Sequence, residues 1–174
     1  MLIMSWYIGV SCNDTVMLFK EVINLYNSNG SSVHCAFIDL SKAFDMIDHE
    51  ILINKLESSD LPSYVVRCVS YMLRNTYVHV KVNDLIGRSW RVEAGTRQGG
   101  ILSGILFNFY FKDCICGILK QNEGCSLGVF KTNIIAYADD IVLMCPSSNG
   151  LQKLVESLGF MLKQIKLKVN VNKS

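Results

Sequence analysis

The chain has 174 residues, of which 50% are hydrophobic and 18% are charged, and its formal net charge is +2. This length accommodates one domain with a sizeable core, and the hydrophobic fraction excludes a disordered tail. The longest apolar stretch, ILSGILFNFYF, is interrupted by polar residues and is too short to cross a bilayer. No signal peptide is visible, so we expect an intracellular protein that does not contact a membrane.

Cysteine and lysine are distributed in ways that limit the function classes. The seven cysteines are odd in number and scattered, which predicts neither a zinc site nor a disulfide framework, so we expect reduced thiols. From Gly150 onward, five lysines accompany a single acid, Glu156. A solvated helix face explains this basic end by itself, and a net charge of +2 does not indicate a nucleic-acid binder.

Apolar periodicity predicts a mixture of helices and strands along the chain. Helices are indicated by spacings of three and four residues together with signals such as Gly30 and Pro62, and strands by short β-rich or alternating runs. In chain order, the predicted elements are a helix over 13–30, a buried strand over 32–40 that ends at Asp39, helices over 49–59 and 62–75, a hairpin over 77–95 that turns at 84–87, a buried helix over 103–120, a second hairpin over 133–145 and a lysine-rich helix over 149–166. Helices mixed with antiparallel strands predict the α+β class.

Two adjacent aspartates, Asp139 and Asp140, interrupt the apolar run NIIAYADDIVLMC. Neighbouring carboxylates repel each other, and burial of a charge requires compensation. The predicted hairpin places both residues at its exposed tip, where aspartate tolerates turn geometry. One interpretation is therefore a solvent-exposed turn without a further role. The other is a pair of acids that holds a cation.

A third carboxylate, Asp39, closes the predicted strand in CAFIDLSKAFD. If this strand lies beside the second hairpin, Asp39 and Asp139 converge. Two oxygen donors on neighbouring strands, with substrate phosphates supplying the other ligands, suit Mg²⁺. Two such ions about 3.5–4 Å apart can activate an attacking hydroxyl and stabilise a leaving pyrophosphate. The three acids therefore favour phosphoryl-transfer chemistry with two Mg²⁺ ions, for which Mn²⁺ is an alternative.

Four segments, in order along the chain, resemble the motifs of a reverse transcriptase palm: AFIDLSKAFDMIDHEILINKL, AGTRQGGILSGILFNFYF, AYADD and LKVNVNKS. They are most similar to the enzymes of non-LTR (LINE-like) retrotransposons, and the resemblance covers residues 32–174. It implies a polymerase palm, in which an antiparallel sheet packs against helices. It also implies an RNA-directed DNA polymerase, with an RNA template, a DNA primer and dNTPs as partners.

The resemblance assigns the acidic cluster to catalysis. Asp39 and Asp139 match the catalytic, metal-binding aspartates, and Asp140 matches the second acid of the same signature. Tyr137 begins that signature and is assigned to substrate binding.

Four further residues match parts of the substrate site. Phe44 matches the aromatic residue that blocks a ribose 2′-hydroxyl, although from the sequence alone a hydrophobic-staple or core phenylalanine is the better explanation. Gln98 and Gly99 match the element that lines the nucleotide and template pocket, where glycine permits close backbone approach. Lys173 matches a late lysine that supplies a cation for the departing pyrophosphate. His49, in contrast, is expected at the surface.

The segments that resemble a reverse transcriptase correspond to the palm and not to the fingers or thumb of a polymerase. We expect a single partial domain over 1–174, in which the fingers and thumb are largely missing, so that the chain alone does not polymerise and needs a partner for them. The alternative hypothesis is an inactive retroelement remnant, or a module that binds nucleic acid or protein. An RNA-templated RNA polymerase is disfavoured, because Ala138 rather than glycine precedes Asp139 and because Phe44 occupies the gate position.

Overall fold

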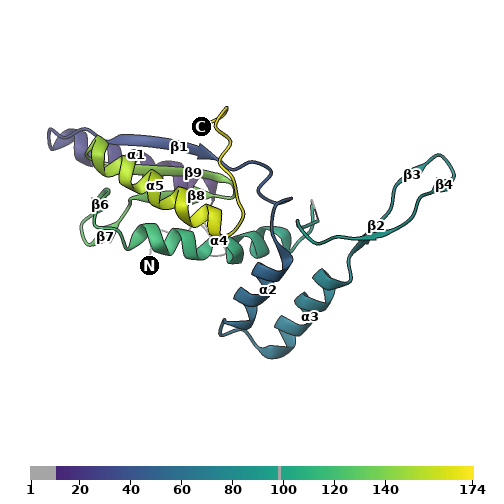
Figure 1. The fold of residues 1–174 in the computed structure, drawn as a ribbon. Helices are drawn as coiled ribbons and strands as arrows, with labels where there is room; N and C mark the ends of the chain where they lie inside the picture. The colour runs from purple at the N-terminus through teal and green to yellow at the C-terminus, as the bar shows by residue number, and fades with distance from the viewer. Residues whose placement is uncertain (1–10, 98) are drawn as a thin grey trace. The chain divides into compact units, whose positions relative to one another are not determined.

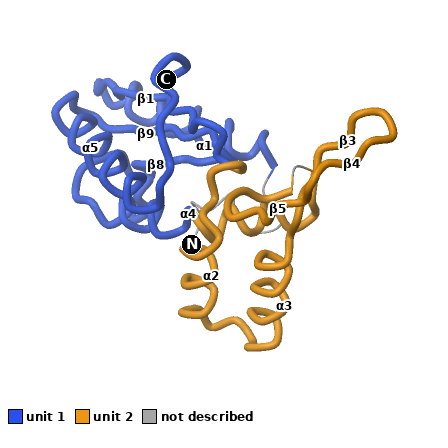
Figure 2. Tube along the Cα trace, turned by 45° about the vertical axis from the view of Figure 1, so that its right-hand side comes forward, with its two compact units in different colours: residues 1–43, 111–174 blue, residues 44–110 orange. Residues whose placement is uncertain are grey.

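The computed structural model describes residues 11–97 and 99–174. The chain divides into two compact units, coloured separately in Figure 2: unit 1 comprises residues 1–43 and 111–174, and unit 2 comprises residues 44–110. Helix α4 (Ser103–Leu119) begins in unit 2 and ends in unit 1.

Unit 1 contains a three-stranded antiparallel sheet in the order β1-β9-β8 (Figure 1). Besides the C-terminal part of α4, its other described elements are two helices and a small hairpin. The bounds are α1 (Cys12–Ser28), β1 (His34–Asp39), β6 (Ser126–Leu127), β7 (Phe130–Lys131), β8 (Ile134–Tyr137), β9 (Asp140–Cys145) and α5 (Ser148–Gln164). The β6–β7 hairpin was not predicted from the sequence.

Strand β1 differs from its prediction as a buried strand. Only Ile38 is buried in it, and Phe37 is 59% exposed. Phe37 projects from the face of the sheet that α1 covers, and Phe19 of α1 lies beside it at 5.9 Å between ring centroids, but this cover leaves more than half of the Phe37 side chain exposed.

The two faces of the sheet are covered differently. On one face, Val22 of α1 lies in a buried cluster with Cys125, Ile135 and Met144. The opposite face is buried and carries Ile38, Ile134, Ala136, Ile141 and Leu143. Helix α5 contacts β1 and β9. We infer that α5 packs on the opposite face, since a helix on the α1 face of β1 and β9 would cover Phe37, which is exposed.

Local sequence explains how the helices of unit 1 begin and pack. The Ser11 hydroxyl accepts from the Asp14 N–H at 3.3 Å, and the Asp14 carboxylate accepts from the Ser11 N–H at 2.8 Å, which forms a capping box at α1. These hydrogen bonds hold the pKa of Asp14 below its usual value. In α5, buried leucines recur every four residues, at Leu154, Leu158 and Leu162, and form the stripe that faces the core.

Unit 2 contains two packed helices and a long hairpin. The bounds are α2 (His49–Glu57), α3 (Ser63–Arg74), β2 (Tyr77–Val78), β3 (Lys81–Val82), β4 (Leu85–Ile86) and β5 (Trp90–Arg91). Asp48 caps α2, because its carboxylate accepts from the Ile51 N–H at 3.0 Å. Strands β2 and β5 pair at the base of the hairpin, and β3 and β4 pair at its outer end (Figure 2).

The hairpin in unit 2 was predicted, but its turn was placed too late. Val82 pairs with Leu85, so the turn is Asn83–Asp84 rather than residues 84–87. Asn83 has a φ of +53°, a left-handed conformation that asparagine tolerates better than most residues. Leu85 and Ile86 therefore belong to the returning strand.

The α+β class and the type of every predicted element are confirmed by the structure. Within the described residues, none of the helices combines the length and apolarity that a bilayer crossing requires. All seven cysteines are free thiols, and burial raises the pKa of Cys125 to about 11.

Candidate active site

The two adjacent aspartates lie at the β8–β9 hairpin but occupy different positions in it. Tyr137 pairs with Asp140, so that Ala138 and Asp139 form a two-residue loop. The tip therefore carries Asp139, which is half-buried, whereas Asp140 is exposed and begins β9. The prediction of both acids at the tip was wrong by one residue. Ala138 has a φ of +54°, and two-residue hairpin loops need such a conformation to match the twist of their strands.

Asp39 lies directly opposite Asp140 in the register of β1 and β9. Cross-strand partners project from the same face of a sheet, and like charges in this arrangement repel each other. Asp139, which was predicted from the sequence to converge with Asp39, directly precedes Asp140 and lies in the loop. Among residues 11–97 and 99–174, no lysine or arginine forms an ion pair with any of the three. The end of the sheet thus concentrates negative charge.

The C-terminal segment, residues 168–174, holds Asp39 from its other side. The Asn170 side-chain amide donates to Asp39 Oδ2 at 2.9 Å, and the Asn170 N–H donates to the Asp39 carbonyl at 2.8 Å. The Asp39 N–H donates to Ser174 Oγ at 3.2 Å. Leu40 forms an antiparallel bridge with Val169, and Figure 1 shows this yellow segment beside the end of β1.

These contacts of Asp39 were missed by the sequence-based prediction. The sequence matches the segment LKVNVNKS to a palm motif, but only its lysine, Lys173, is assigned a role there. In the structure Lys173 is exposed, and its N–H donates to the Asn170 carbonyl at 3.0 Å. Asn170 and Ser174 of this segment are the residues that contact Asp39.

The acids at the end of the sheet fit a hard cation whose other ligands come from substrate. Within the described part of the chain, no three His, Cys, Asp or Glu side chains gather into a metal site of their own. Mg²⁺ in nucleotide sites is usually held by one or two carboxylates together with substrate phosphates. Asp39 and Asp140 present such a pair, and a bound cation would offset their mutual repulsion.

Phe44, in unit 2, is half-buried and packs on a second phenylalanine. Its ring lies 4.9 Å from the ring of Phe107 between centroids, with a tilt of 35°. Phe107 is fully buried, and the Phe44 carbonyl accepts from the Thr96 N–H at 2.8 Å. The Phe44 ring is therefore backed on one side by α4 while part of it remains exposed.

Of the predicted pair Gln98 and Gly99, only the glycine can be described, because Gln98 lies outside the described residues. Gly99 has a φ of +74°, and a Cβ added there would meet nothing within 4 Å. The conformation, rather than a lack of space, is therefore what favours glycine at this position.

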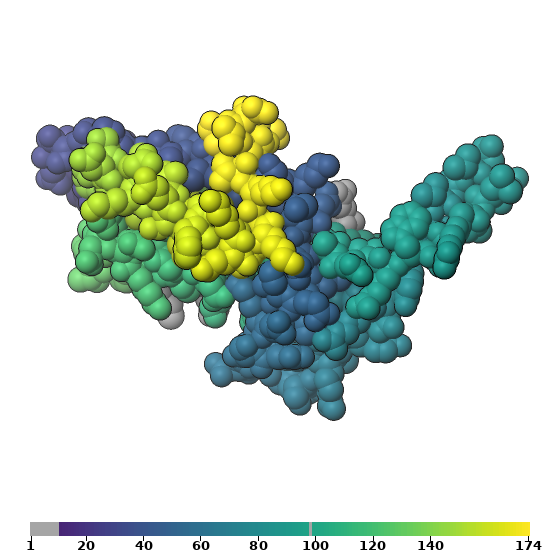
Figure 3. Space-filling model, viewed as in Figure 1, coloured from purple at the N-terminus to yellow at the C-terminus, as the bar shows by residue number. Residues whose placement is uncertain are grey.

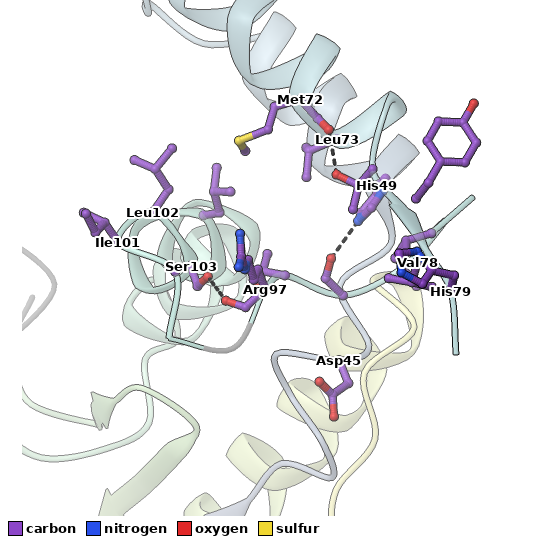
Figure 4. A pocket seen from close by; sticks show the side chains of 18 residues that line it. Asp45, His49, Met72, Leu73, Val78, His79, Arg97, Ile101, Leu102 and Ser103 are labelled. Atoms are coloured by element: carbon purple, nitrogen blue, oxygen red, sulfur yellow. Dashed lines mark hydrogen bonds between the residues drawn. The ribbon is translucent and has the colours of Figure 1, made fainter. Parts of the chain in front are cut away.

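Unit 2 also contains a cavity of about 920 Å³, shown in Figure 4. His49 lines it and is only 3% exposed, so the expectation of a surface histidine was wrong. Its Nε2 donates to the Gly95 carbonyl at 2.7 Å, a tertiary contact that no local pattern indicates. None of the predicted site residues that the structure describes lines this cavity.

An antiparallel sheet that packs against helices and carries the paired acids Asp39 and Asp140 at its end is consistent with the α+β palm of a polymerase. Solved structures with this fold include apo telomerase from Candida tropicalis, truncated from its C-terminal domain, with a TM-score of 0.69 at 14% identity. Telomerase from Candida albicans in complex with a TWJ fragment of telomeric RNA has a TM-score of 0.71 at 17% identity. The match covers 94% of this chain in both cases, and 34% and 30% of those chains.

The chain belongs to the reverse transcriptase (RNA-dependent DNA polymerase) family, whose model matches residues 7–174. The Pol polyprotein of the type-1 retrotransposable element R2 from Nasonia vitripennis is 31% identical over 144 residues, which are 83% of this chain and 14% of that protein. The Pol polyprotein of the type-2 element R2DM from Drosophila melanogaster is 32% identical over 167 residues, which are 93% of this chain and 15% of that protein. The resemblance to non-LTR retrotransposons is thus confirmed, and this family generally uses divalent metal ions.

Proposed function

We propose that the chain forms the palm of an RNA-directed DNA polymerase of a non-LTR retroelement. In this proposal it transfers nucleotidyl groups from dNTPs to the 3′ end of a DNA primer on an RNA template. The observation that carries the proposal is the placement of Asp39 opposite Asp140, with Asp139 in the adjoining loop, in a member of the reverse transcriptase family. The similarity to a telomerase solved with an RNA fragment supports a nucleic-acid partner.

Asp39, Asp139 and Asp140 would hold the divalent ions, which we propose to be two Mg²⁺, or Mn²⁺ in their place. When bound, such ions activate the primer hydroxyl and stabilise the leaving pyrophosphate. The protein fixes Asp39 through the sheet register and the C-terminal segment. Asp140 is exposed and therefore accessible to substrate phosphates. These features prepare the charge of the site before substrate arrives, which lowers the cost of reorganisation during the reaction.

The remaining site residues would bind and select the substrate. The partly exposed ring of Phe44 would exclude a ribose 2′-hydroxyl, and Tyr137, which is 43% exposed, would contact the substrate beside the acids. Gln98 and Gly99 would line the nucleotide and template pocket. Lys173 is exposed and would neutralise charge on the departing pyrophosphate.

The test is a chimera in which this chain replaces the matching segment of an active R2 protein. Primer extension on an RNA template with dNTPs is measured against the parent protein. We expect extension that requires a divalent ion and that falls by about 10³-fold or more in Asp39→Asn and Asp140→Asn, because their carboxylates act in the reaction itself. Asp84→Asn is the matched control, since this exposed acid lies in the turn of the unit 2 hairpin.

Two outcomes would oppose the proposal. Equal extension by the Asp39→Asn, Asp140→Asn and Asp84→Asn chimeras would exclude a catalytic role for the acids at the end of the sheet. A folded chimera that binds primer and template but does not extend the primer would support the binding-module alternative.

A further inference from the structure

Asn170 forms a side-chain hydrogen bond with Asp39, one of the candidate acids. Its amide nitrogen donates to Asp39 Oδ2 at 2.9 Å, and its N–H donates to the Asp39 carbonyl at 2.8 Å. The side chain is half-buried, so water competes with this hydrogen bond less than it would at a fully exposed site. One residue thus fixes both the backbone and the carboxylate of Asp39.

The position of Asn170 is itself built by the backbone of the C-terminal segment. The Ser41 N–H donates to the Lys168 carbonyl at 2.8 Å, and Leu40 forms a bridge with Val169. Beyond Asn170, its carbonyl accepts from the Lys173 N–H at 3.0 Å and from Ser174 Oγ at 2.9 Å. Ser174 Oγ in turn accepts from the Asp39 N–H, which closes the network on Asp39. The asparagine is therefore held in place on both sides.

We infer that Asn170 is a positioning residue for the divalent-ion site, and this inference rests on the proposed function. An amide donor on Oδ2 fixes the rotation of the Asp39 carboxylate and leaves Oδ1 free to bind a cation. The donor is a neutral amide, so it places no competing positive charge beside Asp39 and Asp140. Hydrogen-bond partners of metal ligands act in this way elsewhere, and their loss typically lowers metal affinity about 10–100-fold.

The test measures Mn²⁺ binding to the 174-residue chain by electron paramagnetic resonance, with thermal unfolding in metal-free buffer as the second readout. Asn170→Leu keeps most of the side-chain volume but removes the donor, and we expect its Mn²⁺ affinity to fall about 10-fold. Asn172→Leu is the matched control, because this exposed asparagine lies in the same segment and is expected to bind Mn²⁺ like the unchanged chain. Asp39→Asn defines the signal that remains when the site is lost.

The outcomes separate this inference from the proposed function. If the unchanged chain binds no more Mn²⁺ than Asp39→Asn, the divalent-ion site itself is wrong, and the inference falls with it. If the unchanged chain binds Mn²⁺ and Asn170→Leu binds it equally, the proposed site stands and the positioning role is overturned. A lower unfolding temperature of Asn170→Leu at unchanged affinity would likewise overturn the inference, because it would show that Asn170 serves only the stability of the fold.

Discussion

Phe44 combines two properties that sequence alone presented as alternatives. It packs on the buried Phe107, as a core residue would, and part of its ring remains exposed, as a substrate-contacting residue requires. The contact with Phe107 limits the directions in which the ring can move. A rigid ring excludes an extra oxygen better than a mobile one, so Phe107 supports the proposed gate.

The first prediction at this scale concerns sugar selection by the chimera. Phe44→Val should lower the ratio of kcat/KM for dNTP over rNTP by about 10-fold or more, because a smaller side chain makes room for the 2′-hydroxyl. Phe107→Leu should change the ratio in the same direction by a smaller factor. Phe160→Leu removes a ring that is 66% exposed on α5 and should leave the ratio unchanged. An unchanged ratio in Phe44→Val, accompanied by a loss of stability, would reduce Phe44 to a packing residue.

Among the elements, the β8–β9 hairpin shows a conflict between its sequence and its geometry. Ala138 adopts a φ of +54°, which costs a residue with a Cβ roughly 1–2 kcal/mol, whereas glycine adopts it freely. Asp139 and Asp140 lie on either side of the end of this loop, so the conformation of Ala138 sets where both carboxylates lie.

The prediction for this hairpin is a change in the free energy of unfolding, measured by urea denaturation. Ala138→Gly should raise it by about 0.5 kcal/mol, because relief of the strained φ exceeds the added flexibility of the unfolded chain. Ala138→Val should lower it by about 1–2 kcal/mol, because a β-branched residue tolerates positive φ poorly.

Ala94→Val is the control for the added bulk. Ala94 is exposed, has no positive φ and forms an antiparallel bridge with Asp48, so valine should change the stability there by less than about 0.5 kcal/mol. Equal losses at both positions would show that the backbone of Ala138 carries no strain.

Sequence patterns predicted the elements well because the patterns are local. The helical spacing of α1 and α5, the caps and the alternation in the hairpins all act within a few residues. Two of the wrong predictions depended on partners far along the chain. The exposure of Phe37 depends on how far α1 covers the sheet, and the buried position of His49 involves a hydrogen bond to the Gly95 carbonyl.

The same distinction applies to the candidate site. The acids were found from the sequence because adjacent carboxylates in an apolar run are conspicuous. The pairing of Asp39 with Asp140 required the strand register, since a shift of one residue would have placed another residue opposite Asp39. Asn170 was missed because its partner lies 131 residues away and because a single asparagine in a short motif indicates no particular contact.

For the binding of nucleic acid, the distribution of charge over the molecule matters more than the net charge. The net charge is +2, yet the three acids are concentrated at one end of the sheet in unit 1. Of the five lysines after Gly150, Lys153 is paired with Glu123 at 2.8 Å, and Lys163, Lys168 and Lys173 are exposed. Figure 3 shows the C-terminal part of the chain, in yellow, at the molecular surface. Phosphates can therefore reach the exposed side chains of Lys163, Lys168 and Lys173.

The last prediction is that the 174-residue chain binds single-stranded RNA weakly and with a shallow dependence on salt. Each neutralised phosphate contributes about 0.7 to the slope of log K against log salt concentration for a single strand, so Lys163, Lys168 and Lys173 together support a slope of about −2. The measurement is fluorescence anisotropy of a labelled oligonucleotide across a salt series. Replacing both Lys163 and Lys168 with glutamine should reduce the magnitude of the slope by about 1.4.

The control replaces Lys20 and Lys120, which are exposed elsewhere in unit 1, with glutamine. Both double variants lower the formal net charge by two, from +2 to zero, so they differ only in where the charge is removed. If the C-terminal lysines form the phosphate-binding surface, only the first variant flattens the salt dependence. Equal flattening in both would mean that net charge alone attracts the RNA, and the basic C-terminal end would then be no more than a solvated face.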